Sequence, residues 1–366
     1  MTAALPIPAV LDDVTPEWLT AALRASGALR EAKVASVSAE LIGAGEGFLG
    51  QVGRLTPTYD RPEGPSAGGR TPESLVVKLA SSSASTRKLA LELGLYEREV
   101  RFYQELRPHV ALPAPYCHAA AFEASTGRFL LLLEDLRAMR QEGHLAGARE
   151  SLELAVDTLA ALHAQWWESP RLKLFDWLMV WSGVPPVEGF DAAWRGVAVD
   201  CAGRLPAAAA ALCERFVDCR RSLGRRLIRP PLTLLHGDYR LENMFFAAGA
   251  PRPFAIVDFQ LVVQGRGGHD LAWFLCTSLE VERRRELEAE IVRRYHTGLL
   301  EGGVRDFDLD ACWWEYRAGV VAALWRLVYA YTSLKSSDEQ GSYRQMIERA
   351  AAAVADLDGA ALLADL

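Results

Sequence analysis

The sequence predicts an α+β fold in two lobes, with the strands gathered in the first lobe and the helices in the second. The chain has 366 residues, enough for about two domains that each bury a core. Strand-like segments dominate up to about residue 135, and helical periodicity dominates after about residue 150. We therefore assign residues 1–135 to a first lobe and residues 136–366 to a second, mostly helical lobe.

Composition and charge narrow the class of protein. Half of the residues are hydrophobic, 24% are charged and the net charge is −7, whereas a nucleic-acid surface usually carries a basic stripe. The N-terminus lacks the basic residues and long apolar core of a signal peptide. The apolar stretch 318–331 is short and contains Arg326, so it predicts a buried helix and not a membrane span. We expect a soluble cytoplasmic protein without nucleic-acid or membrane partners, and its oligomeric state stays open.

The cysteines agree with a reducing compartment. None lies in a Cys-x-x-Cys pair or at zinc spacing from a histidine, which disfavours a disulfide framework or a zinc site. The six are Cys117, Cys201, Cys213, Cys219, Cys276 and Cys312.

The first lobe begins with a helix and a strand that lead into a glycine-rich stretch. Thr15-Pro16-Glu17 combines a capping hydroxyl, a proline at the first helical position and an acid, so we expect a helix over 15–27. A strand-like segment, 34–42, then enters Gly43-Ala44-Gly45-Glu46-Gly47-Phe48-Leu49-Gly50. Repeated glycines permit close approach of a ligand, and an ordinary hairpin turn fits them equally well.

A lysine and a glutamate follow on successive elements. In the strand 74–80, Lys78 shares a face with Val76 and Ala80. In the helical pattern 87–106, Glu99 lies within an apolar stripe. A buried carboxylate needs a cation, and Lys78 is the obvious partner. The alternatives are a lysine extending from an exposed edge and a glutamate facing water.

The predicted secondary structure changes from strands to helices between the first lobe and the second. The apolar run 129–133 predicts a central strand that opens into a linker at Glu134-Asp135-Leu136. Helical patterns follow at 151–167, 192–227, 271–300, 309–330 and 348–363. His163 on the first of them is expected to be a core histidine, with catalysis as the weaker alternative.

A polar loop lies between apolar strands in the second lobe. The run 232–235 leads into His236-Gly-Asp238-Tyr-Arg240-Leu-Glu-Asn243, a second apolar run follows, and the strand 254–257 ends at Asp258. Carboxylates and an amide at the edges of buried strands are costly unless something compensates them. A magnesium–phosphate complex would do so. The spacing H-x-D-x-x-x-x-N followed by D-F is that of a kinase catalytic loop and metal loop.

Together these motifs resemble a known group of enzymes. Over about residues 40–335 the chain is similar to the aminoglycoside phosphotransferase-like and choline-kinase-like small-molecule kinases. The loop at 236–246, Ile-Val-Asp-Phe-Gln at 256–260, Gly-His-Asp-Leu-Ala-Trp from 268, and 159–167 look most like the ecdysteroid-kinase-like branch. The loop reads His-Gly-Asp where protein kinases have His-Arg-Asp, and no Ala-Pro-Glu follows.

The resemblance implies a protein-kinase-like two-lobed fold, with an antiparallel sheet and a helix in the first lobe and a helical second lobe. It also implies ATP and Mg²⁺ as cofactors. The first lobe would bind the nucleotide, with linker backbone groups contacting adenine; the implied nucleotide-binding residues are Gly43, Gly45, Gly47, Phe48, Lys78, Glu99, Glu134 and Leu136. The irregular glycine spacing leaves open which glycines contact phosphate.

The catalytic roles follow from the same resemblance and from phosphoryl-transfer chemistry. Asp238 would take the proton of the acceptor hydroxyl, and Asn243 and Asp258 would bind Mg²⁺ through hard oxygen atoms. Arg240 would place a positive charge at the transferred phosphate, or else form a salt bridge to Glu242 or another acid. His236 and Asp270 would brace the loop, and neither is expected to be the base.

The acceptor is the open question. Every tryptophan except Trp18 lies after residue 165, mixed with charges of both signs, which favours a small, largely apolar alcohol. Most of these rings individually are more simply explained as core. An aminoglycoside, macrolide or choline-type amino-alcohol kinase is the alternative within enzymes. A pseudokinase-like module that holds nucleotide without turnover is the alternative outside them.

Overall fold

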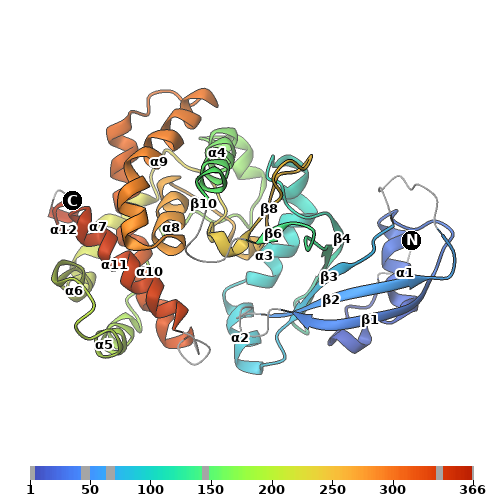
Figure 1. Ribbon diagram of the computed structural model, residues 1–366. Helices are drawn as coiled ribbons and strands as arrows, with labels where there is room; N and C mark the ends of the chain where they lie inside the picture. The colour runs from blue at the N-terminus through green and yellow to red at the C-terminus, as the bar shows by residue number, and fades with distance from the viewer. Residues whose placement is uncertain (1–4, 43–49, 63–70, 142–147, 335–340, 365–366) are drawn as a thin grey trace. The chain divides into compact units, whose positions relative to one another are not determined.

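The computed structural model describes residues 5–42, 50–62, 71–141, 148–334 and 341–364, and these form two compact units (Figure 1). The first unit comprises the chain up to Met139 together with 255–260, and the second comprises 140–254 and 261–366. Residues 255–260 thus join the first unit, whereas the sequence-based division placed them in the second lobe. The reason is local packing, because Phe259 stacks on Phe102 with ring centroids 3.7 Å apart.

An antiparallel sheet of five strands forms the first unit. The strands run in the order β1-β2-β3-β5-β4, and each neighbouring pair is antiparallel. Their bounds are β1 Val34–Ile42, β2 Gly50–Tyr59, β3 Leu75–Ala80, β4 Cys117–Glu123 and β5 Arg128–Glu134. Leu75, Val77 and Leu79 alternate with half-buried residues along β3, so the other face of the strand is the one that carries Lys78.

The N-terminal helix covers this sheet. Helix α1, Pro16–Ala25, begins as predicted: the Thr15 side chain accepts a hydrogen bond of 3.2 Å from the Trp18 N–H, and Pro16 is the first helical residue. Its buried face, which includes Leu19 and Leu23, shares one core cluster with residues of the sheet.

The helix predicted over 87–106 is interrupted. It consists of α2 Ala84–Glu92, α3 Leu95–Arg101, a π-helical turn at 102–106 and a short 3₁₀ turn. Gly94 separates α2 from α3 because it adopts a φ of +65°, which glycine tolerates and other residues rarely do. The predicted apolar stripe is nevertheless confirmed: Leu95, Glu99, Phe102 and Leu106 are all buried.

The second unit is mostly helical. Its helices are α4 Arg149–Trp166, α5 Phe190–Asp200, α6 Ala207–Glu214, α7 Phe216–Leu227, α8 Gly268–Ser278, α9 Val281–Glu301, α10 Leu309–Leu334, α11 Ser342–Asp356 and α12 Gly359–Ala364. Helix α10 packs against α8, α11 and α5 and is buried along most of its length. The single helical pattern predicted over 192–227 is three helices, and Pro206 caps the second of them. Among the described residues, no helix is long and apolar enough to span a membrane.

Short strands hold the polar loop. Strand β7, Thr233–Leu235, pairs antiparallel with β10, Val263–Gly265, and β6, Arg140–Gln141, pairs antiparallel with β8, Met244–Phe246. Because β7 precedes the loop and β8 follows it, the backbone of the loop is anchored at both ends. Strand β9, Phe254–Ile256, leads to Asp258. The predicted α+β fold, with an antiparallel sheet in the first unit and a helical second unit, is confirmed.

Candidate active site

Three charged side chains meet in the first unit. The Nζ atom of Lys78, on β3, lies 2.8 Å from Oε2 of Glu99, on α3, and 2.8 Å from Oδ1 of Asp258. The predicted ion pair between Lys78 and Glu99 is therefore confirmed, and the lysine does not extend from an exposed edge. The contact with Asp258 is an addition that the sequence did not predict.

Burial and charge act against each other in this cluster. Burial disfavours the charged form of Lys78, but Asp258 and Glu99 outweigh it and raise the pKa of the lysine above its ordinary value. Burial also raises the pKa of Glu99, although Lys78 and the backbone N–H of Phe259 favour its carboxylate. The cluster contains one ammonium group and two carboxyl groups, so a further positive charge would be electrostatically favourable beside it.

Asp258 is held in an unusual backbone conformation. Its φ is +70°, in the left-handed region that residues other than glycine rarely adopt. Neighbouring groups fix the segment: the Gln260 amide donates to Oδ2 of Asp258 at 3.1 Å, and Arg98 donates to the Gln260 carbonyl at 2.9 Å. Such local strain concentrates at functional sites, where the surroundings over-determine it.

The structure describes the predicted linker but only the last residue of the predicted glycine loop. Gly43, Gly45, Gly47 and Phe48 lie outside the described residues. Gly50 is needed for strand packing, because a Cβ there would lie 2.7 Å from the Leu79 carbonyl oxygen on the neighbouring strand.

Two backbone groups of the linker form hydrogen bonds within the first unit. The Glu134 N–H donates to the Tyr116 carbonyl at 2.8 Å, and the Leu136 carbonyl accepts from the Met139 N–H at 2.8 Å. The Glu134 N–H and the Leu136 carbonyl are thus already engaged within the first unit.

In the second unit, Asp270 braces the polar loop. Its carboxylate accepts hydrogen bonds from the backbone N–H groups of His236, at 2.7 Å, and Gly237, at 2.9 Å. Gly237 has a φ of +81°, and a Cβ there would lie 2.1 Å from the Leu261 carbonyl oxygen, so this position requires glycine. The predicted bracing role of Asp270 is confirmed.

His163 supports the same aspartate and is a structural residue. It is fully buried on α4, with Nε2 3.4 Å from the Asp270 carboxylate and Nδ1 2.7 Å from the Tyr295 hydroxyl. Both ring nitrogens thus face groups of the protein interior, which confirms the expectation of a core histidine. His236 is also buried, and its Nδ1 accepts the Asp238 N–H at 3.2 Å.

The carboxylate of Asp238 is fixed from two sides. Oδ1 accepts the indole N–H of Trp273, on α8, at 2.8 Å, and Oδ2 accepts the amide of Asn243 at 3.1 Å. The side chain is 11% exposed, so the carboxylate is nearly enclosed but can still be reached. This arrangement holds the oxygens of Asp238 in defined directions.

Two arginines flank this carboxylate. Nε of Arg240 lies 3.4 Å from Oδ1 of Asp238, and Arg326, on α10, donates to the Gly237 carbonyl at 2.8 Å. Burial alone would raise the pKa of Asp238, but the two arginines outweigh it and hold that pKa below the ordinary value. The carboxylate is therefore ionised at neutral pH and able to accept a hydrogen bond from an alcohol.

Arg240 also approaches Glu242, at 3.9 Å. It thus makes ion-pair contacts of the kind that the salt-bridge alternative requires, and its place beside Asp238 equally suits a role at a phosphate.

Two residues of this cluster were not predicted as site residues. Trp273 lies three residues after Asp270 and hence on the same side of α8, a spacing that could have marked it. Arg326 is the one charged residue in the apolar stretch 318–331, and it was noted only as an interruption. A lone charge in a buried helix needs a partner, which is a signal that sequence reasoning could have used.

The proposed metal ligands have suitable chemistry, each within its own unit. The amide nitrogen of Asn243 donates both to the Asp238 carboxylate and, at 2.9 Å, to the Asp238 carbonyl, which leaves the amide oxygen to act as a ligand. Asp258 offers a carboxylate already drawn to a cation. Carboxylate and amide oxygens are the protein ligands that Mg²⁺ accepts, so the donor set fits this ion.

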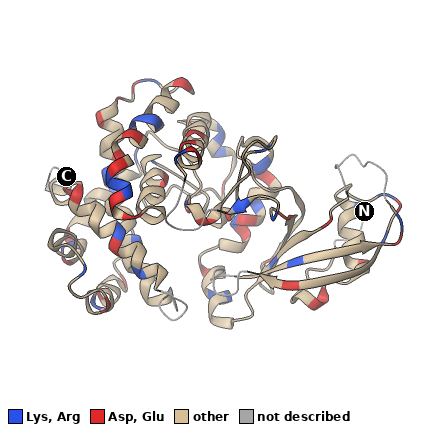
Figure 2. Ribbon diagram, in the orientation of Figure 1, with Lys and Arg blue, Asp and Glu red and all other residues tan. Residues whose placement is uncertain are grey.

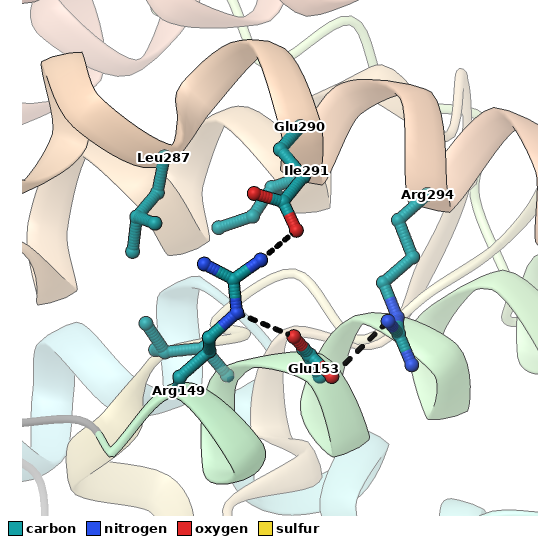
Figure 3. Close-up of a pocket in the computed structure, with 7 residues that line it drawn as sticks. Arg149, Glu153, Leu287, Glu290, Ile291 and Arg294 are labelled. Atoms are coloured by element: carbon teal, nitrogen blue, oxygen red, sulfur yellow. Dashed lines mark hydrogen bonds and ion pairs between the residues drawn. The ribbon is translucent and has the colours of Figure 1, made fainter.

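The hollow between α4 and α9 is not a candidate site (Figure 3). Its volume is about 10 Å³, and ion pairs line it: Arg149 contacts Glu153 at 2.9 Å and also Glu290, and Arg294 contacts Glu153 at 3.1 Å. The ribbon of Figure 2 is coloured for both basic and acidic residues in the region of α9. These charges tie two helices together and leave space for no more than a water molecule.

The tryptophans of the second unit fall into two groups. Buried rings, which fit the core interpretation, are Trp166, Trp194, Trp273 and Trp325. Half-buried rings are Trp167, Trp177, Trp181, Trp313 and Trp314. The predicted predominance of core rings thus holds for only part of the set, and Trp181 lies beside Arg326.

Comparison with known proteins decides the family. The family model described as "APH: Phosphotransferase enzyme family" matches residues 66–307, about two thirds of the chain. The chain belongs to this phosphotransferase family. A search of curated proteins finds no match.

Solved structures agree on the fold of this APH family member. The GDP and kanamycin complex of APH(2")-IIia is 16% identical with a TM-score of 0.51, and the match covers 88% of this chain and 94% of that one. The choline kinase from Cryptosporidium parvum Iowa II is 13% identical with a TM-score of 0.50, covering 90% of each chain. At these identities the likeness establishes the kinase-like fold and leaves the acceptor open.

Proposed function

We propose that this APH family member is an ATP- and Mg²⁺-dependent kinase that phosphorylates a hydroxyl group of a small, largely apolar molecule. The observation that carries the proposal is the fixed, ionised carboxylate of Asp238, oriented by Trp273 and Asn243. A general base must present a free lone pair in a defined direction, and this arrangement does so.

In the proposed reaction the acceptor oxygen forms a bond to the γ-phosphorus of ATP, and the bond from that phosphorus to the bridging oxygen breaks to release ADP. Asp238 accepts the proton of the acceptor hydroxyl. Lys78, kept charged by Glu99 and Asp258, would bind phosphate oxygens of the nucleotide. Arg240 would add a positive charge at the transferred group.

Asn243 and Asp258 would each offer an oxygen ligand to Mg²⁺. The bound ion supplies charge neutralisation for the phosphates. The glycines at 43, 45 and 47, with Phe48, would cover the phosphates, and the Leu136 N–H would bind the base.

The apolar acceptor is inferred from the half-buried aromatic rings of the second unit, and the ecdysteroid-kinase-like branch from the motifs around His236 and Gly268. A non-catalytic module is less well supported, because Lys78, Asp238, Asn243 and Asp258 are all present in the sequence. We also propose a cytoplasmic location, on the strength of six free cysteines.

The test has two stages. Thermal shift with ATP and Mg²⁺ measures nucleotide binding, and ADP release is then followed across sterols, macrolides, aminoglycosides and choline. Asp238→Asn should abolish ADP release while the ATP affinity changes less than about threefold. If Asp238→Asn turns over as fast as the unaltered protein, the assignment of the base is wrong. Nucleotide binding without turnover for every acceptor class would favour the non-catalytic module.

A further inference from the structure

An arginine lies between two tryptophans in the second unit. Cζ of Arg326 is 3.9 Å from the ring centroid of Trp273 and 5.0 Å from that of Trp181, both within the range of a cation–π contact. Trp181 is itself held in place, because its backbone N–H donates to the Gln264 carbonyl at 2.8 Å and His269 packs edge-on against its ring.

This stack is joined directly to the proposed base. Arg326 donates to the carbonyl of Gly237, the residue before Asp238, at 2.8 Å. The Trp273 ring that contacts the guanidinium also donates its N–H to the Asp238 carboxylate at 2.8 Å. Whatever approaches Asp238 therefore approaches Arg326 and its aromatic neighbours as well.

We infer that Arg326 determines the charge class of the acceptor: it fills the tryptophan pair with the chain's own cation, so that the alcohol brought to Asp238 is neutral or anionic and not an ammonium compound. This inference rests on the proposed function, since it concerns the acceptor of that reaction.

The physical argument begins with the rings. Proteins that bind quaternary ammonium groups use the negative faces of aromatic rings, tryptophan best of all. Here one face of each ring is already engaged by a guanidinium, which stays protonated under all ordinary conditions. A ligand ammonium would have to displace a charge that is covalently part of α10.

The surrounding charges point the same way. A cation at Asp238 would meet Arg240, 3.4 Å from the carboxylate, in addition to Arg326. Of the acids nearby, Asp270 accepts two backbone N–H groups, and Glu242 has Arg240 as a neighbour at 3.9 Å. Like charges that approach closely in a partly buried site repel strongly.

A matched pair of alcohols tests the inference. Choline and 3,3-dimethylbutan-1-ol have nearly the same shape and differ in the charge of one central atom. Binding of each is measured by ligand-observed NMR and calorimetry on the full-length protein without nucleotide. The unaltered protein should bind the neutral alcohol at least about tenfold more tightly than choline.

Arg326→Met removes the cation and keeps an unbranched apolar stem. In this variant choline binding should rise at least about tenfold relative to the neutral alcohol, because the tryptophan faces become available. Arg317→Met makes the same chemical change on α10, where the arginine binds the carbonyls of Leu357 and Asp358, and should leave the ratio unchanged. Arg326→Gln is the second neutral variant in case the methionine variant does not fold.

The possible results distinguish failure of this inference from failure of the proposed function. The inference is overturned if the unaltered protein prefers choline, or if a folded neutral variant at position 326 gains no choline binding. Because binding is measured without ATP, the result does not depend on turnover. A protein that shows the charge discrimination and yet releases no ADP with any acceptor would count against the proposed function and leave the inference standing.

Discussion

Lys78 lies as close to Asp258 as it does to Glu99, at 2.8 Å from each carboxylate. One ammonium thus links a strand, a helix and the segment after β9, which are separated by up to 180 residues in the chain. Because Glu99 is buried and Asp258 is 22% exposed, the lysine is anchored from the interior, while its second partner is accessible to solvent.

Removing the charge of Glu99 should release this anchor. Glu99→Gln leaves Lys78 paired with Asp258 alone, so the lysine is drawn towards the carboxylate that we propose as a metal ligand. We expect ATP–Mg²⁺ affinity to fall by about tenfold or more, measured by calorimetry, together with a lower melting temperature. Glu97→Gln on the same helix, where the side chain is 53% exposed, is the control and should change neither quantity.

The Trp273 N–H should matter for turnover more than for folding. Trp273→Phe keeps a ring beside Arg326 and removes the donor to Asp238, so kcat should fall about tenfold while ATP affinity is retained. Trp325→Phe is the matched control, since among the described residues its buried N–H has no hydrogen-bond partner. Equal losses in the two variants would show that the hydrogen bond to Asp238 is unimportant.

Gly237→Ala should be strongly destabilising. The new Cβ would overlap the Leu261 carbonyl oxygen, 2.1 Å away, in addition to the strain of a φ of +81°. We expect a loss of more than about 3 kcal/mol in the free energy of unfolding, measured by urea denaturation. Gly203→Ala, with a φ of +75° and open space around it, isolates the backbone term and should cost only about 1 kcal/mol. A tolerated alanine at 237 would mean that the loop does not need this tight turn.

Acid should weaken the second unit through His269. Burial, followed by the charge of Arg326, lowers the pKa of this histidine to about 4, whereas the unfolded value is about 6.5. The unfolded state therefore binds the proton first, and stability that is fully present above about pH 6.5 is lost as the pH falls towards 4. The full loss is roughly 3 kcal/mol.

Urea denaturation at pH 7.5 and pH 5 measures this effect. The decrease should be smaller in His269→Phe, which cannot take up a proton, and unchanged in His109→Gln, where the histidine is exposed. An equally steep decrease in His269→Phe would assign the acid sensitivity to other groups.

Residues that interrupt a regular apolar pattern within one strand or helix could be predicted as site residues from the sequence. Lys78 and Glu99 stand out because each interrupts the apolar pattern of its own element. Because the two elements follow each other in the chain, an ion pair between these residues could be predicted. The break at Gly94 was also visible in principle, since a glycine inside a helical pattern is costly. The apolar stripe continued through it and concealed the break.

Other contacts depend on tertiary structure. Nothing local indicates that Asp258 meets Lys78, or that Arg326 meets Trp273, because each pair is brought together by the packing of separate elements. Asn243 is intermediate: its spacing from Asp238 suggested a ligand, but the bond from its amide nitrogen to the Asp238 carboxylate shows which atom of the amide is available.

Helix α8 carries both Asp270, which holds the loop backbone, and Trp273, which holds the Asp238 carboxylate. One support of the loop backbone and one support of its acidic group therefore come from the same helix. A shift of α8 would move both supports together, so the loop backbone and the Asp238 carboxylate would keep their alignment with each other. Substitutions that alter the packing of α8 on α10 would therefore change the position of the loop and the orientation of the Asp238 carboxylate together.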